Sequence, residues 1–92
     1  MVDKFKDVPL DEGIRVLFES PMKFGDKDIL YQKWAMEGIV AESIVFLTDD
    51  VSHLSDEELE EYVKSSDIVN FDSSVTMSRK EQYSFINFNF KS

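Results

Sequence analysis

The segment from Leu54 to Lys64 constrains the fold most, because it carries several helix start signals side by side. Ser55 is followed three residues later by Glu58, the spacing at which both side chains bond backbone N–H groups at a helix N-terminus. Leu54 and Leu59 flank this pair at the spacing of a hydrophobic staple. The sequence therefore predicts that a helix begins directly after Ser55.

The same segment has the apolar and charge patterns of an amphipathic helix. Leu59, Tyr62 and Val63 are spaced to share one helical face, which predicts the side that is buried. Acidic residues precede them near the positive end of the helix dipole, and Lys64 follows near the negative end. We predict a helix over residues 56–65.

Acidic residues concentrate around this helix. The range Glu37–Asp72 contains eleven acidic residues and one basic residue, Lys64, so it carries a net charge of −10, whereas the whole chain carries −9. Carboxylates three or four positions apart on a helix repel one another, and few lysines are placed to offset this. The carboxylates that we predict as contact residues for a partner are Asp49, Asp50, Asp56, Glu57, Glu58, Glu60 and Glu61.

Two interpretations of this acidic surface stay open. It is either a solvated helix face with a favourable charge bias at its N-terminus, or a surface that binds lysine and arginine side chains of a basic protein. The second interpretation predicts a non-enzymatic protein-binding module. If the partner is a nucleic-acid-binding enzyme, the carboxylates occupy phosphate positions, as in small phage or mobile-element inhibitors of the anti-restriction and anti-CRISPR type. No residue motif assigns the chain to a family.

The net charge and the apolar pattern limit the other partners. A charge of −9 repels nucleic acid and anionic membranes, so we expect neither to bind directly. The longest apolar run, Ile39–Leu47, is interrupted by Glu42 and is far shorter than the about 20 residues that span a bilayer. The N-terminus shows no apolar signal segment and the chain has no cysteine, so we expect a cytoplasmic protein.

The length and the aromatic content predict one globular domain over residues 1–92. Hydrophobic residues make up 42% of the chain and include eight Phe, three Tyr and one Trp, more than a disordered acidic tail would carry. We expect a monomer or a homodimer.

Near the N-terminus the sequence predicts a helix over Leu10–Ser20. Pro9 precedes this range, Pro21 follows it, and four apolar residues within it fall on one helical face. A strand through Ile14–Phe18 is the competing interpretation, because every residue of this range except Arg15 is β-branched or large and apolar.

A loop and a hairpin are predicted next. The loop covers Met22–Asp28 with Gly25 at its turn. Alternating side chains over Ile29–Leu47 then predict two strands that turn near Glu37–Gly38, where the glycine accepts a positive φ. A helix over residues 28–37 is the main alternative.

The last third of the sequence predicts a second hairpin. Its strands cover Ile68–Met77 and Tyr83–Phe90, and Ser78–Glu81 forms the turn. Tyr83 and Phe85 have the opposite parity to the later phenylalanines, so either both sheet faces are covered or a bulge shifts the register.

Together these elements predict the fold class. We expect a small α+β domain with a four-stranded, mainly antiparallel sheet and two helices on one face. The order is helix-hairpin-helix-hairpin, which fits an αββαββ arrangement.

Catalytic and metal-binding motifs find little support. His53 is the only histidine, and no Gly-rich nucleophile elbow accompanies it for a Ser–His–Asp triad. An EF-hand loop fails from both Asp49 and Asp50, because several ligand positions hold the wrong residue types. We predict no catalytic residue, no metal site and no cofactor. A minor metal-binding or hydrolytic domain that uses His53 is the second alternative function.

The C-terminal strand offers another candidate surface. Gln82–Phe90 has no charged residue and is rich in aromatic side chains, so at a sheet edge it would pair with a second copy. The first alternative function is therefore a small self-associating structural or assembly subunit. A covered central strand is the competing interpretation. The residues of this candidate dimer seam are Phe85, Ile86, Phe88 and Phe90.

Overall fold

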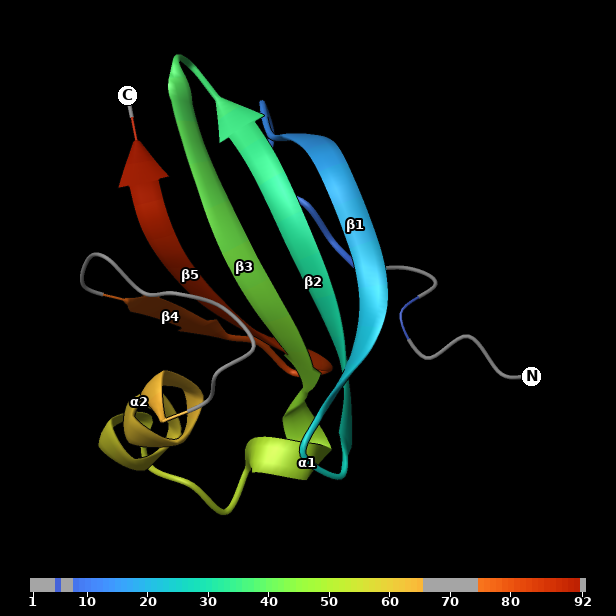
Figure 1. The fold of residues 1–92 in the computed structure, drawn as a ribbon. Helices are drawn as coiled ribbons and strands as arrows, with labels where there is room; N and C mark the ends of the chain where they lie inside the picture. Colours follow the sequence, from blue (N-terminus) through green and yellow to red (C-terminus); the bar gives the residue numbers. More distant parts are fainter. Residues whose placement is uncertain (1–4, 6–7, 66–74, 92) are drawn as a thin grey trace.

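The computed structural model describes residues 5, 8–65 and 75–91. Its elements in chain order are β1 (Arg15–Phe24), β2 (Lys27–Met36), β3 (Ile39–Leu47), α1 (Thr48–Val51), α2 (Asp56–Lys64), β4 (Thr76–Arg79) and β5 (Tyr83–Lys91). The strands form one antiparallel sheet in the order β1-β2-β3-β5-β4, so that β1 and β4 are its edges (Figure 1). The prediction of an antiparallel α+β domain is confirmed, and the prediction of four strands is wrong.

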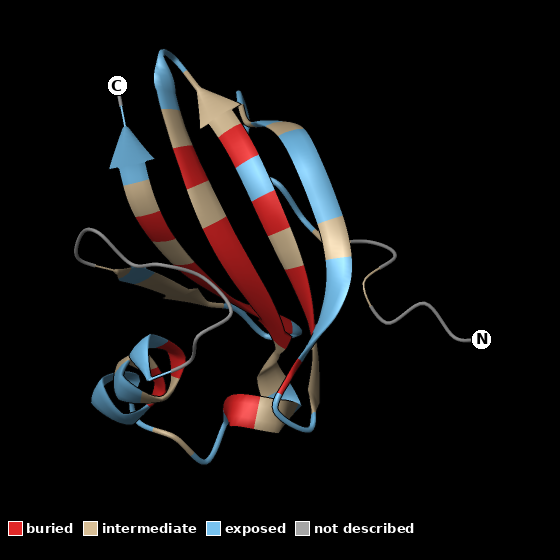
Figure 2. Ribbon diagram, viewed as in Figure 1, coloured by how far each residue is buried: buried red, intermediate tan, exposed pale blue. Residues whose placement is uncertain are grey.

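The predicted helix over Leu10–Ser20 is wrong, because from Arg15 onward this range belongs to the edge strand β1. The helical spacing of its apolar residues is not used for burial, because β1 pairs with β2 along its whole length and leaves most of its side chains in solvent (Figure 2). Leu17 is the extra residue of a bulge that shifts the register between Val16 and Phe18. The competing interpretation, a strand through Ile14–Phe18, describes this region better, and the helix-hairpin-helix-hairpin order is wrong.

Pro21 lies inside β1 without interrupting the sheet. Phe24 and Lys27 close the two-residue turn, and such a closing pair exchanges backbone hydrogen bonds. Because bonded and non-bonded pairs alternate in an antiparallel ladder, Pro21 and Leu30 form a non-bonded pair. The nitrogen of Pro21 therefore points away from β2, where an edge strand tolerates a residue without an N–H group.

Both hairpin turns use positive φ angles. Gly25, with a φ of 63°, takes the first position of the β1–β2 turn, so this turn is placed correctly although the loop is shorter than the predicted Met22–Asp28. Glu37 and Gly38, with φ angles of 47° and 81°, form the β2–β3 turn in the pattern of a type I′ hairpin. The predicted turn near Glu37–Gly38 is therefore confirmed, and the alternative helix over residues 28–37 is wrong.

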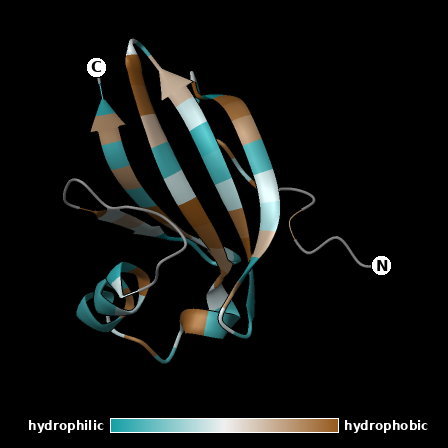
Figure 3. Ribbon diagram, viewed as in Figure 1, coloured by the Kyte–Doolittle hydropathy of each residue, from teal (hydrophilic) through white to brown (hydrophobic). Residues whose placement is uncertain are grey.

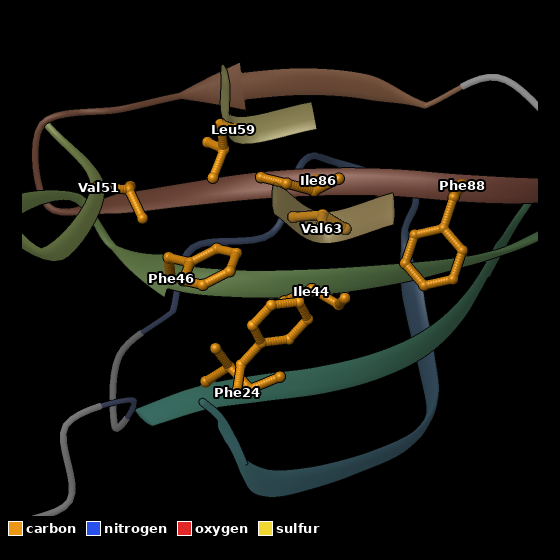
Figure 4. Packing of buried hydrophobic residues seen from close by; sticks show 9 residues of the cluster. Phe24, Ile44, Phe46, Val51, Leu59, Val63, Ile86 and Phe88 are labelled. Carbon is orange, nitrogen blue, oxygen red and sulfur yellow. The ribbon is translucent and has the colours of Figure 1, made fainter. Parts of the chain in front are cut away.

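The main core lies on the side of the sheet that faces α2, which we call the helix face. Phe46 is fully buried there, and its ring centroid lies 5.6 Å from that of Phe24. Leu59 and Val63 of α2 pack into this core (Figure 4). The buried members of this cluster are Phe24, Ile29, Ile44, Phe46, Val51, Leu59, Val63, Ile86 and Phe88.

The acidic helix forms as predicted. Helix α2 covers Asp56–Lys64, within one residue of the predicted 56–65, and Ser55 is its N-cap. Leu59 and Val63 are fully buried and Tyr62 packs beside them, so the predicted apolar stripe faces the sheet. The hydrophobic burial of this stripe anchors a helix of nine residues, which would be unstable alone in water.

The other side of the sheet, which we call the opposite face, carries a smaller core. Leu30, Val45 and Phe85 are buried there, and Phe5 and Val8 of the N-terminal segment pack against their cluster. The ring centroids of Phe5 and Tyr83 lie 6.1 Å apart. Both faces of the central strands are therefore covered, although by different parts of the chain.

Strand β5 has buried side chains on both faces of the sheet, and it also contains a bulge. Tyr83 and Phe85 belong to the core of the opposite face, and Ile86 and Phe88 belong to that of the helix face. Asn89 and Phe90 then stand opposite a single residue of β3, which makes a bulge, and Asn89 has a φ of 55°.

Alternation along β5 predicts that Phe90 shares a face with Ile86 and Phe88. Because of the bulge, Phe90 lies on the opposite face instead. Its ring meets that of Trp34 on the opposite face, with centroids 6.1 Å apart. The second hairpin also differs at its start. Strand β4 ends at Arg79, so the turn falls at residues 80–82, and most of the predicted strand over Ile68–Met77 lies outside the described residues.

Candidate functional site

Glu58, one of the predicted contact residues, belongs to the capping box at the start of α2. The backbone N–H of Glu58 donates to Ser55 Oγ at 3.1 Å, and the backbone N–H of Ser55 donates to Glu58 Oε1 at 2.9 Å. The Ser55 backbone, and secondly its hydroxyl, lower the pKa of the Glu58 carboxyl below its ordinary value. Glu58, the third residue of α2, therefore stabilises the start of the helix, and one of its oxygens already has a partner.

Four other carboxylates line one groove between α2 and the start of β4. Figure 1 shows α2 beside β4, and Figure 3 shows hydrophilic residues over most of the helix. Val75 and Met77 contribute apolar surface to the same groove. Its acidic residues are Asp56, Glu57, Glu60 and Glu61. We call this surface the acidic groove.

Two carboxylates of the acidic groove have cationic partners within the chain. Arg79 Nη1 lies 3.0 Å from Asp56 Oδ1, and Lys64 Nζ lies 3.5 Å from Glu60 Oε2. Glu57 and Glu61 have no ion pair with any described residue, and both are exposed. The uncompensated charge of the groove therefore centres on two glutamates one helical turn apart.

Arg79 does more than neutralise Asp56. Its Nη2 donates to the Val51 carbonyl at 2.6 Å, and its Nη1 donates to the Leu54 carbonyl at 2.9 Å. Val51 ends α1 and Leu54 precedes the N-cap of α2, so one guanidinium joins β4 to both helices. This residue positions the acidic groove, but no local pattern predicts its role, because its partners lie 23 to 28 residues earlier in the chain.

Asp49 and Asp50 lie outside the acidic groove. They occupy the first turn of α1, which residues 52–55 connect to α2. Asp49 is exposed and Asp50 is half-buried, and neither has an ion pair with a described residue. The seven predicted contact residues therefore divide into the groove, the capping carboxylate of Glu58 and this separate pair.

His53 is exposed in the turn between the two helices. Within residues 5, 8–65 and 75–91, no three His, Cys, Asp or Glu side chains are grouped so that they could hold a metal ion.

The candidate dimer seam lies on an interior strand. Strand β5 stands between β3 and β4, and Phe85, Ile86 and Phe88 are buried. Phe90 is 41% exposed, and its ring and that of Trp34 form a T-shaped pair. Pairing with a second copy through these residues would require an edge that β4 occupies along Ser84–Asn87.

A row of polar side chains on the opposite face was not among the predicted sites. Trp34 Nε1 donates to Ser43 Oγ at 2.7 Å, and Ser43 Oγ donates to Asn87 Oδ1 at 2.5 Å. Gln32, only 3% exposed, lies beside Ser43 in the register and donates to Glu19 Oε2 at 3.3 Å. We call Gln32, Trp34, Ser43 and Asn87 the polar row. The polar row could have been predicted from Gln32, a polar residue at a position of β2 that alternation assigns to a buried face.

A second polar cluster lies on the helix face. Tyr31 donates its hydroxyl to Glu42 Oε1 at 2.6 Å, and Asn89 Nδ2 donates to Glu42 Oε2 at 2.9 Å. Burial, and secondly the bond to the Glu42 carboxylate, raise the pKa of the Tyr31 hydroxyl. The hydroxyl is therefore held protonated as a donor, which fits a structural role.

No protein-family model matches the chain, and no curated protein or solved structure matches it either. In the described part of the chain, no helix combines the length and the apolar content that crossing a membrane requires.

Proposed function

We propose that the protein is a non-enzymatic module that binds a basic protein through the acidic groove of α2. The observation that carries this proposal is the alignment of Asp56, Glu57, Glu60 and Glu61 along one groove, two of them without an ion pair among the described residues. Asp49 and Asp50 extend the contact from α1. Negative potential on one surface speeds association with a positive partner and selects against acidic ones.

The groove favours arginine or lysine as the inserted side chain. Both have an aliphatic stem that packs on apolar surface while the charged end reaches a carboxylate. Met77 and Val75 supply the apolar surface, and Glu57 and Glu61 supply the carboxylates. Met is well suited to such a contact because its side chain adapts to the shape of the ligand.

The partner class that we favour is a nucleic-acid-binding enzyme, which the protein inhibits. A helix presents its carboxylates at a spacing of about 5–6 Å, and a groove built for phosphates offers basic side chains to them. This is the arrangement expected of a phage or mobile-element inhibitor of the anti-restriction or anti-CRISPR type.

A pair of charge reversals tests the groove. The Glu57→Lys/Glu61→Lys variant is compared with Glu12→Lys/Glu37→Lys, which changes the net charge equally. Glu12 and Glu37 are exposed, and Glu37 lies in the β2–β3 turn at the far end of the sheet from α2 (Figure 1). Each protein is immobilised and exposed to a lysate at low and at high salt, and binding of the captured protein is then titrated.

We expect the groove variant to weaken binding at least about tenfold at low salt and the control variant to leave it nearly unchanged. Equal losses in both variants would show that only net charge matters and would refute the groove. Displacement of the captured protein by duplex DNA supports phosphate mimicry. Binding that DNA does not affect restricts the proposal to a basic partner of another kind.

The alternative of a self-associating subunit has a separate test. Sedimentation over a range of concentrations would reveal a dimer, and Phe90→Lys, at the exposed seam position, would dissociate it. A monomer at all concentrations would remove this alternative.

A further inference from the structure

We propose that the opposite face contains a binding site for one small, uncharged aromatic ring. The site is a partly enclosed cavity of about 130 Å³ between the sheet and the segment that precedes β1. It is separate from the acidic groove, and the proposal does not depend on the function proposed above.

The volume of the cavity suits a single ring. An apolar cavity of about 150 Å³ in a protein core is large enough to bind benzene. The cavity of the opposite face is slightly smaller, so its size is that of one six-membered ring. Its apolar lining residues are Pro9, Leu10, Ile14, Trp34, Met36 and Phe85.

The polar row, which contributes to the wall of the cavity, already has hydrogen-bond partners within the chain. Trp34 Nε1 donates to Ser43 Oγ at 2.7 Å, and Ser43 Oγ donates to Asn87 Oδ1 at 2.5 Å. Gln32 Nε2 donates to Glu19, which does not line the cavity, at 3.3 Å. Because these bonds use much of the polar capacity of the wall, the attraction for a ligand comes mainly from apolar and aromatic surface.

The other polar lining residues favour neither an ion nor ordered water. Lys80 Nζ lies 3.5 Å from Asp11 Oδ1, so the two charges at the cavity offset each other. The Ser78 hydroxyl is the one polar lining group whose side chain has no partner among the described residues. A buried water molecule needs about 2–4 polar partners, and most groups of this wall are already engaged. Displacement of such poorly bonded water by an apolar ring favours binding.

The wall also contains groups that attract an aromatic ring more than a saturated one. Trp34 of β2 and Phe85 of β5 line the cavity, and aromatic pairs gain energy beyond the burial of their area. Met36 adds a thioether, which makes favourable contacts with aromatic rings. Lys80 Nζ lies 5.7 Å from the centroid of the Phe85 ring, so an ammonium group stands near the cavity for a second ring.

The segment over the cavity can open to admit a ligand. Residues 9–13 are exposed and belong to no helix or strand. The ion pair of Asp11 with Lys80 joins them to the β4–β5 turn, and the two side chains are 76% and 41% exposed. Ion pairs at the surface contribute little to stability, so this connection is easily broken.

Titration of the labelled full chain with benzene, followed by NMR, tests the site. Trp34 is the only tryptophan, so its indole N–H gives a single reporter signal. We expect a saturable shift of this signal with about millimolar affinity, and nuclear Overhauser contacts from benzene to the methyl groups of Ile14 and Met36. Cyclohexane, a saturated ring, and benzoate, a charged aromatic ring, are the controls, and both should bind at least about threefold more weakly.

Two variants that add the same ring to the covering segment complete the test. Ile14→Phe fills the cavity from outside the strands and should weaken benzene at least about tenfold. Glu12→Phe places the ring at an exposed position that does not line the cavity and should leave benzene within about twofold. Shifts that do not saturate, equal or tighter binding of either control compound, or equal affinities of the two variants would overturn the proposal.

Discussion

The two faces of the sheet are closed by different chemistry. On the helix face, Leu59 and Val63 of α2 press into a cluster of aromatic and branched side chains around Phe46. On the opposite face, buried Gln32 and Ser43 belong to a row of hydrogen bonds beside a cavity. Close packing stabilises the first face, since dense interiors leave few voids. On the second face, hydrogen bonds hold the side chains of the polar row in place beside the cavity.

The largest loss of stability should come from the helix face. Phe46→Ala removes a fully buried ring that packs on Phe24 and Tyr62, so we expect unfolding to become easier by about 3–5 kcal/mol. Denaturant unfolding followed by circular dichroism measures the change. Phe18→Ala is the control, because Phe18 is 56% exposed and should cost less than about 1 kcal/mol. Equal losses would show that the core is not centred on Phe46.

The next effect should come from the connection between β4 and the helices. Arg79→Met leaves the carbonyls of Val51 and Leu54 without this donor, so we expect a loss of about 2–3 kcal/mol. Asp56→Asn removes only the exposed ion pair and should cost less than about 1 kcal/mol. If both variants lose the same stability, the ion pair and not the carbonyl contacts holds α2 in place.

A smaller effect is expected on the opposite face. Ser43→Ala takes the acceptor from the buried Trp34 indole, and we expect a loss of about 1–2 kcal/mol with faster hydrogen exchange at Trp34 Nε1. Ser78→Ala, whose hydroxyl has no partner among the described residues, should change stability by less than about 0.5 kcal/mol. An indole that exchanges equally slowly in Ser43→Ala would contradict a polar row held by hydrogen bonds.

The smallest effect concerns the pH dependence of the capping box. Because the folded pKa of Glu58 is lowered, the carboxylate stabilises the fold above its ordinary pKa of 4.5, and this contribution is lost as the pH falls through the folded value. NMR titration should therefore give a lower pKa for Glu58 in the natural chain than in Ser55→Ala. The difference in melting temperature between the two proteins should shrink as the solution is acidified. Identical titration curves would exclude the capping interaction as the cause.

Local signals made the helix α2 and the central hairpin predictable. The capping box lies within four residues, and Glu37–Gly38 specifies its turn within two, so neither depends on the rest of the chain. The carboxylates Asp56, Glu57, Glu60 and Glu61 share one groove because the helix alone sets their spacing. Arg79 reaches them only after the chain has formed β4, which no local pattern reveals.

The edge strand and the bulges were harder to predict, because their residues do not alternate between buried apolar and exposed polar positions. Leu17 and Phe18 are apolar yet exposed on β1, so alternation was weak and the helical spacing around them was accidental. Asn89 adopts a positive φ that moves Phe90 to the other face, and most asparagines do not adopt such an angle, so the sequence does not reveal it. The cavity depends on a segment that folds back over the sheet from outside it, and periodicity carries no information about such contacts.

The outward nitrogen of Pro21 limits the growth of the sheet beyond β1. A new strand laid along this edge would meet a pyrrolidine ring in place of an amide hydrogen, with Glu19 and Lys23 on either side. Leu17, Phe18 and Met22 can therefore stay in water without recruiting the backbone of another molecule into a fibril. Strand β1 therefore exposes apolar side chains and, through Pro21, hinders backbone pairing with another molecule along the same edge.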